Sequence, residues 1–122
     1  MTLPILLVDD DLDACETMAK LFHAHGYMAD IALDGKAALT RIEQRRYGLA
    51  IIDYQMPGMN GVDVMRRIRR ARPELPAVFL TGYTTIDVVF PAVEAGVLRV
   101  FPKPVNFREL LAIVEEQLGA AA

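Results

Sequence analysis

The segment LAIIDYQMPGMNG, residues 49–61, joins a run of four aliphatic residues to a loop that contains proline, asparagine and two glycines. The run has the composition of a buried β-strand, and it ends on a single carboxylate, Asp53. Burying a carboxylate without a partner costs free energy. Other parts of the chain should therefore bring cations or hydrogen-bond donors to Asp53.

The composition is that of a single globular domain. The chain has 122 residues, of which 53% are apolar, and we predict one domain over residues 1–122. The tail, residues 119–122, is expected either to fray or to lead into a missing output domain. A net charge of -3 gives no general attraction to nucleic acid or anionic lipid, and the run Arg66–Arg72 is interpreted as a solvated helix face.

The cysteine content and the length of the apolar runs bear on the cellular compartment. Cys15 is the only cysteine and cannot form a disulfide within the chain. No leader-like segment precedes the first apolar run, and no apolar run reaches the roughly 18 residues of a membrane span. We therefore expect a cytoplasmic protein without a membrane segment.

Apolar strands and amphipathic helices alternate five times along the chain. The predicted strands are residues 5–8, 27–32, 49–52, 77–80 and 97–101. The first helix should bury Leu12, Cys15, Met18, Ala19 and Phe22 and end at Gly26. The second should be capped by Asp34, the third should end before Pro73, and the last should begin with a capping box at Asn106 and Glu109. This alternation predicts an α/β domain with a parallel sheet between two layers of helices.

Polar residues follow the predicted strands at their carboxyl ends, which is where open parallel sheets bind ligands. Three of them are the carboxylates Asp9, Asp10 and Asp53, which would repel one another unless a cation lay among them. Oxygen ligands without histidine or cysteine favour a hard ion, and the sequence predicts Mg²⁺. Thr81 and Lys103, at the ends of the fourth and fifth strands, can bind oxygens of an anion.

Four motifs in this order resemble the receiver domains of bacterial two-component response regulators, of which the chemotaxis receiver is one. They are VDDD (8–11), DYQMPGMNG (53–61), LTGY (80–83) and FPKPV (101–105), and the likeness covers essentially the whole chain. The resemblance implies a flavodoxin-like, doubly wound sheet of five parallel strands in the order 2-1-3-4-5, with five helices in a three-layer α/β/α arrangement.

The resemblance also assigns roles to individual residues. Asp53 would be the phosphoacceptor, and Thr81 and Lys103 would hold the phosphoryl oxygens. Mg²⁺ would be bound by Asp10, Asp53 and the backbone carbonyl of Gln55, with Asp9 acting directly or through water. The Lys103–Pro104 peptide bond is expected to be cis.

Three positions are expected to modulate the signal. Gln55 and Tyr83 flank the expected water path, and we predict that they set the lifetime of the acyl phosphate; Tyr83 either leans over the site or covers apolar surface. Val100 stands where many relatives carry an aromatic switch residue, and a β-branched side chain cannot swing in the same way. Pro91 lies inside the fourth helix, expected at about residues 84–95, and should kink, shorten or shift it. We therefore predict retained phosphoryl chemistry with an atypical output.

The expected partners follow from the same resemblance. A sensor histidine kinase or phosphotransfer protein would supply the phosphoryl group, and a downstream effector or an attached output domain would receive the signal. If the domain forms a homodimer, we expect the interface on the face formed by the fourth helix, fifth strand and fifth helix. We expect no direct binding of nucleic acid, and no turnover of an external substrate, so the domain is not classed as an enzyme.

Two other functions are compatible with parts of the sequence. A small haloacid-dehalogenase-like phosphatase would use Asp9 as its nucleophile, because Asp9 and Asp11 follow an aliphatic strand. The short chain and the loop after Asp53 argue against this alternative. A degenerate receiver that acts only as a binding module is the second.

Overall fold

The core of the protein is a five-stranded parallel sheet. The computed structural model describes residues 2–58, 60–82 and 86–119. The strands are β1 (Ile5–Val8), β2 (Ala29–Ala32), β3 (Leu49–Asp53), β4 (Ala77–Thr81) and β5 (Val100–Pro102). They lie in the order β2-β1-β3-β4-β5, and every pair is parallel. The predicted sheet and strand order are confirmed.

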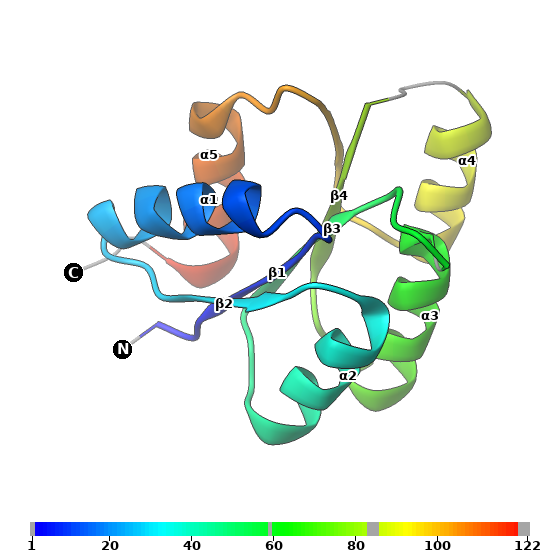
Figure 1. Cartoon of the computed structure of the whole chain (residues 1–122), viewed down its shortest axis with the longest axis horizontal. Coiled ribbons are helices and arrows are strands. Elements are labelled where there is room, and N and C mark those ends of the chain that lie inside the picture. Colours follow the sequence, from blue (N-terminus) through cyan, green and yellow to red (C-terminus); the bar gives the residue numbers. More distant parts are fainter. Residues whose placement is uncertain (1, 59, 83–85, 120–122) are drawn as a thin grey trace.

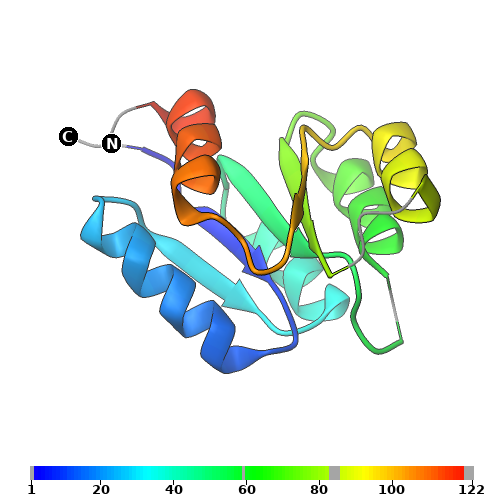
Figure 2. The ribbon, with the colours of Figure 1, turned by 90° about the horizontal axis from the view of Figure 1, so that it is seen from above.

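Helices cover both faces of the sheet (Figure 1). One face carries α1 (Leu12–Ala24) and α5 (Phe107–Leu118), and the other carries α2 (Gly35–Gln44), α3 (Gly61–Ala71) and α4 (Ile86–Ala95). Figure 2, seen from above, shows the same two groups on opposite sides of the strands. The result is the predicted three-layer α/β/α arrangement. No helix in the described ranges is long and apolar enough to cross a membrane.

Strand residues alternate between two hydrophobic clusters because successive side chains point to opposite faces of a sheet. In β1, Ile5 and Leu7 pack in the cluster under α1 and α5, whereas Leu6 and Val8 pack in the cluster under α2 and α3. Both clusters consist of buried residues, so the central strands are apolar on both faces. This burial explains why the strands are continuous aliphatic runs.

Polar caps and one glycine set the helix ends and so fix the loops. Asp11, Asp34, Asn60 and Asn106 each accept a hydrogen bond from a backbone N–H in the first turn of the helix that follows. Gly26 has a φ of 88° and ends α1, as predicted. The Gly26 N–H donates to the carbonyl of residue 23 and the next N–H to that of residue 22, which is a Schellman motif.

The fifth strand begins later than predicted, at Val100 instead of residue 97. A second Schellman motif explains the difference. Gly96 has a φ of 82°, its N–H donates to the Val93 carbonyl, and the Val97 N–H donates to the Ala92 carbonyl. The backbone at residue 97 therefore belongs to the end of α4. This helix continues through Pro91 to Ala95, while its predicted start at residues 84 and 85 lies outside the described residues.

Three other sequence predictions need correction. Strand β2 begins at Ala29 and not at residue 27, because the Tyr27 N–H belongs to the Schellman motif that ends α1. Leu12 was expected to be buried but is 45% exposed, because it starts α1 beyond the edge of the sheet. The run Arg66–Arg72 is only partly a solvated face. Arg69 donates to the carbonyls of Pro73 and Gly96, and Arg72 donates to those of Ala71 and Ile42.

Candidate functional site

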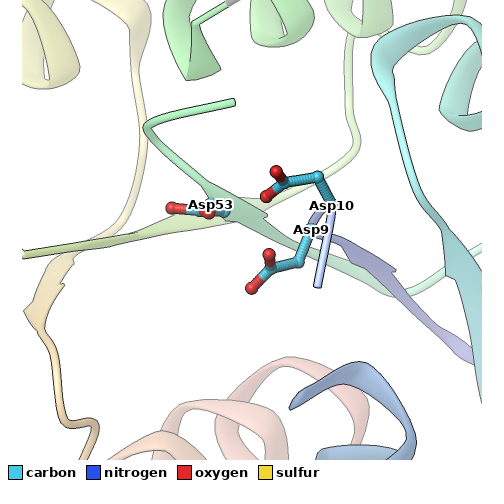
Figure 3. Close-up of side chains that lie close together, drawn as sticks. All are labelled: Asp9, Asp10 and Asp53. Carbon is cyan, nitrogen blue, oxygen red and sulfur yellow. The ribbon is translucent and has the colours of Figure 1, made fainter. Parts of the chain in front are cut away.

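Three carboxylates meet at the carboxyl ends of the two central strands. Asp9 and Asp10 follow β1 and Asp53 ends β3, and the pairing of Val8 with Ile52 brings the two strand ends to the same level. Each residue offers a carboxylate oxygen within 4.8 Å of the others. Figure 3 shows the three side chains side by side. Asp53 is the most buried at 5% exposure, Asp9 is partly buried and Asp10 is exposed.

One ammonium group reaches two of these acids. Lys103 Nζ lies 3.3 Å from Asp53 Oδ1 and 3.7 Å from Asp9 Oδ2. The lysine follows β5, and its backbone N–H donates to the Thr81 carbonyl at 2.8 Å, which joins the ends of β4 and β5. Its peptide bond to Pro104 is cis, as expected. Lys103 is thus one of the cationic partners expected for the buried Asp53. One positive charge, however, cannot neutralise three carboxylates.

Backbone N–H groups orient the acids further. Asp53 Oδ1 accepts from the Gln55 N–H at 3.2 Å, and Asp9 Oδ1 accepts from the Asp11 N–H at 3.0 Å. The loop after Asp53 is held by the Gly61 N–H, which donates to the Tyr54 carbonyl at 2.7 Å. A Cβ at Gly61 would lie 2.9 Å from the Cα of Tyr54, so this close approach requires glycine.

The crowding of like charges shifts the titration of the site. Burial raises the pKa of Asp9 to about 6, and the negative charge of Asp53 adds to the rise, while the Asp11 N–H and Lys103 oppose it. Burial lowers the pKa of Lys103, but Asp53 and Asp9 more than offset this, so the pKa of Lys103 is raised. The ammonium therefore stays charged at neutral pH and offsets one of the three negative charges.

The donor set fits a hard divalent ion. All three side chains offer oxygen, no histidine or cysteine belongs to the group, and the acids could hold a metal ion. A cation placed among them would offset the charge of Asp53, which adds to the effect of burial on the pKa of Asp9. The acidic cluster predicted from the sequence is therefore present.

The remaining predicted residues are distributed around this cluster. Thr81 ends β4 and is buried, one residue beyond the β4 partner of Asp53, which is Leu80. Gly82 follows in open space, since a Cβ there would meet no atom within 4 Å. Gln55 is exposed beside the acids, and Tyr83 lies outside the described residues.

Val100 and its neighbour point in opposite directions, as predicted. Val100 packs against the cluster under α3, on the α3 and α4 face. Phe101 is fully buried in the cluster under α1 and α5, where the guanidinium of Arg99 lies 4.4 Å from its ring centroid. Phe101 therefore cannot take the place of a switch residue at position 100.

Sequence reasoning missed one neighbour of the site. Cys15 Sγ lies 3.6 Å from the backbone carbonyl of Asp9, and burial raises the pKa of the thiol to about 12. The thiol is therefore protonated at neutral pH, which agrees with the interpretation of Cys15 as a core residue. The contact spans six residues across the turn from β1 into α1, so it depends on how α1 begins after Asp11 and has no residue motif of its own.

Comparison with known proteins identifies the class. The response regulator receiver domain family matches residues 5–115. The chain is 30% identical over 115 residues to the transcriptional regulatory protein ZraR of Escherichia coli O157:H7, covering 94% of this chain and 26% of ZraR. It is 38% identical over 115 residues to the DNA-binding response regulator MtrA of Mycolicibacterium paratuberculosis, covering 93% of this chain and 50% of MtrA.

A solved structure agrees with the sequence matches. The CheY-like response regulator receiver domain protein of Methanospirillum hungatei JF-1 superposes with a TM-score of 0.89 at 29% identity, covering 95% of this chain and 93% of that one. The chain therefore belongs to the response regulator receiver domain family, whose members act in two-component signalling. It spans about a quarter of ZraR and half of MtrA. The comparisons support the receiver and not the phosphatase alternative.

Proposed function

We propose that this domain accepts a phosphoryl group on Asp53 in a Mg²⁺-dependent reaction and thereby changes its interaction with a partner. The observation that carries the proposal is the position of Asp53. Its carboxylate is buried, 3.3 Å from Lys103 Nζ, and adjacent to two further acids that need a cation. Phosphoryl transfer requires mainly alignment and charge neutralisation, and these are the properties of such an arrangement.

In the proposed reaction, an Asp53 carboxylate oxygen attacks the phosphorus of a phosphohistidine on a sensor histidine kinase or phosphotransfer protein. The P–N bond breaks, its electron pair returns to the imidazole, and an acyl phosphate forms on Asp53. A small phosphodonor would react in the same way. Water later attacks the phosphorus, which releases inorganic phosphate and restores the carboxylate. Because the domain is itself the substrate, no external compound is turned over.

The metal ligands would be the side chains of Asp9, Asp10 and Asp53 and the backbone carbonyl of Gln55. Bound Mg²⁺ supplies positive charge that neutralises the acids and the incoming phosphoryl oxygens. Asp9 would ligate directly or through water. A nearby cation would favour the charged form of Asp9, opposing the burial and the Asp53 charge that raise its pKa.

Thr81 and Lys103 would hold the other phosphoryl oxygens. Lys103 is 39% exposed at its side chain, so its ammonium borders the entrance as well as the buried Asp53. Thr81 ends the neighbouring strand, and the open space at Gly82 leaves room for an incoming group. Gln55, which is exposed beside the acids, would set the lifetime of the acyl phosphate, and the sequence predicts the same role for Tyr83.

The output would depend on regions outside the site. We propose that the domain is part of a longer cytoplasmic regulator, or signals to a separate effector, since ZraR and MtrA extend well beyond the matched region. Val100 in place of an aromatic switch residue, and Pro91 within α4, support an atypical response of the α4-β5-α5 face. This face is also the surface through which a homodimer would form.

Mass measurement of the intact protein tests the proposal. Incubation with acetyl phosphate and Mg²⁺ should add one phosphoryl mass to the unchanged protein and none to Asp53→Asn. Asp34→Asn is the matched control, because it is the same chemical change at an exposed helix cap. Phosphoryl mass on Asp53→Asn at the normal rate would refute the assignment, and its loss from Asp9→Asn alone would favour the phosphatase nucleophile.

The same measurement distinguishes the binding-module alternative, which predicts no phosphoryl mass on any variant. A beryllofluoride titration then tests the output. We expect large amide shift changes around Asp53 and small ones at residues 86–101. A large displacement of residues 86–101 would show that the usual switch operates despite Val100 and Pro91.

A further inference from the structure

The positive charge of this acidic protein is concentrated on α3. This helix carries four arginines and a single acid, Asp63, and Arg72 follows directly after it. In the part of the chain that the structure describes, no carboxylate lies within 4.0 Å of an arginine nitrogen on α3. The charges on this helix are therefore not balanced by the fold itself.

Within the described ranges, two of these arginines form hydrogen bonds with backbone carbonyls of other elements. Arg69 bonds the carbonyls of Pro73 and Gly96, so it joins the end of α3 to the end of α4, and Arg72 bonds the carbonyl of Ile42. Arg66, Arg67 and Arg70 are exposed. Positive charge in the last turn interacts favourably with the helix dipole, which explains Arg70. Arg66, however, lies a turn earlier and faces Arg70 at i, i+4, where like charges destabilise a helix.

A groove between α3 and α4 presents this charge. It has a volume of about 360 Å³ and is lined by Val62, Arg66, Arg69, Arg70, Pro91, Glu94 and Ala95. Figure 1 and Figure 2 both show the two helices side by side on one face of the sheet. Three of the lining residues are apolar and three are arginines, with Glu94 as the only acid among them. The groove therefore combines an apolar surface with a net positive border.

We propose that this groove docks an acidic amphipathic helix of a partner protein. Glutamate or aspartate side chains spaced four residues apart on the partner match the i, i+4 spacing of Arg66 and Arg70. Its apolar side chains would contact Pro91 and Ala95, which are half-buried, above the buried Val62. Neutralising Arg66 and Arg70 would remove their mutual repulsion. An amphipathic helix uses both the apolar and the charged lining, whereas a nucleic-acid backbone would use only the charge and a flat lipid surface would not enter a groove between two helices.

The position of the groove links it to the phosphoacceptor without depending on it. Helix α3 follows the loop after Asp53, and α4 follows β4, which ends at Thr81. A helix docked across the groove would contact both elements. Binding is predicted for the unphosphorylated domain, so it can be tested whether or not Asp53 accepts a phosphoryl group.

Fluorescence anisotropy with defined probes tests the proposal. The main probe is a labelled peptide in which pairs of glutamates alternate with pairs of leucines, and a second peptide has glutamine at every glutamate position. We expect the acidic peptide to bind the unphosphorylated protein and the glutamine peptide to bind at least tenfold more weakly. Arg66→Gln/Arg70→Gln should weaken binding of the acidic peptide about tenfold.

The control is Arg41→Gln/Arg108→Gln, which removes the same charge from exposed positions on α2 and α5. It should bind the acidic peptide like the unchanged protein, and circular dichroism should show that both double variants are folded. Equal weakening in both variants, equal binding of the glutamine peptide, or no binding of the acidic peptide would overturn the proposal. Preferential binding of duplex DNA or phosphatidylglycerol vesicles would assign the arginines to another class of partner.

Discussion

Carboxylates at the amino ends of the strands and at the carboxyl ends have different partners. Near the amino ends of the strands, Asp30 accepts a hydrogen bond from the Tyr47 hydroxyl at 2.6 Å and forms an ion pair with Arg45 at 3.0 Å. At the carboxyl ends, Asp9, Asp10 and Asp53 crowd within 4.8 Å and share Lys103. In the described residues, a hydroxyl and a guanidinium serve one acid at the amino ends, whereas one ammonium and two backbone N–H groups serve three acids at the carboxyl ends.

This difference separates stability from function. The Asp30 cluster is satisfied by the protein alone, so it joins β2 to the segment before β3 and should stabilise the fold. The cluster around Asp53 would be satisfied by a further cation, which agrees with the raised pKa of Asp9, caused by burial and by the negative charge of Asp53. Substitutions at the amino ends of the strands should therefore change stability, and substitutions at the carboxyl ends should change the rate of phosphorylation.

Removal of divalent metal should have the largest effect. We expect chelation with EDTA to slow phosphorylation by acetyl phosphate by about 1000-fold, because the uncompensated acids then repel the donor. The free energy of unfolding contributed by the Asp30 cluster should not change. The rates are followed by the mass of the intact protein. An unchanged rate in EDTA would show that the reaction does not require a divalent metal.

Removal of the ammonium should have the next largest effect. Lys103→Met should slow phosphorylation by about 100-fold, since one of the groups that stabilise the phosphoryl oxygens is lost. Arg45→Met is the matched control at the opposite edge, and it should leave the rate within about twofold. If both substitutions slowed the reaction equally, the effect would come from net charge and not from the contact with Asp53.

A substitution near the amino ends of the strands should alter stability alone. Tyr47→Phe removes one of the two donors to Asp30 and should lower the free energy of unfolding by about 1–2 kcal/mol, measured by urea denaturation. The rate of phosphorylation should be unchanged. A slower reaction at unchanged stability would show that the two edges are coupled.

The smallest effect should be a gain in stability on removing one charge from the carboxyl ends of the strands. The pKa of Asp9 is about 6 in the folded state against 3.8 ordinarily, so its ionisation between these values disfavours the folded state. Without metal at pH 7, Asp9→Asn should raise the free energy of unfolding by about 1 kcal/mol, because part of the gain is lost with the Lys103 contact. The gain should disappear below about pH 4.

Asp34→Asn serves as the control, since asparagine caps a helix as well as aspartate does. It should change the free energy of unfolding little at either pH. A loss of stability in Asp9→Asn at pH 7 would mean that Lys103 and the Asp11 N–H fully compensate Asp9 in the absence of metal.

Much of the fold and of the site could be predicted from local sequence. Aliphatic runs located the strands, and the caps at Asp34 and Asn106 and the turn at Gly26 located helix ends, because each depends on neighbours in the chain. Asp9, Asp10 and Asp53 could be brought together because parallel strands end at a common edge.

Contacts between distant parts of the chain could not be predicted. Tyr47 and Asp30 are brought together by the pairing of β1 with both β2 and β3, and Arg69 reaches Gly96 only because α3 packs beside α4. The late start of β5 depends on whether Gly96 ends a helix or opens a strand. Glycine is compatible with either, so the tertiary structure decides.

Locating the phosphoryl group tests the central claim most directly. After reaction with acetyl phosphate and Mg²⁺, borohydride reduces an aspartyl phosphate to homoserine, and peptide mass spectrometry identifies the modified position. We expect modification of Asp53 alone, with Asp9 and Asp10 recovered unchanged. Modification of Asp9 or Asp10 with Asp53 intact would contradict it, because the buried acid beside Lys103 would then not be the nucleophile.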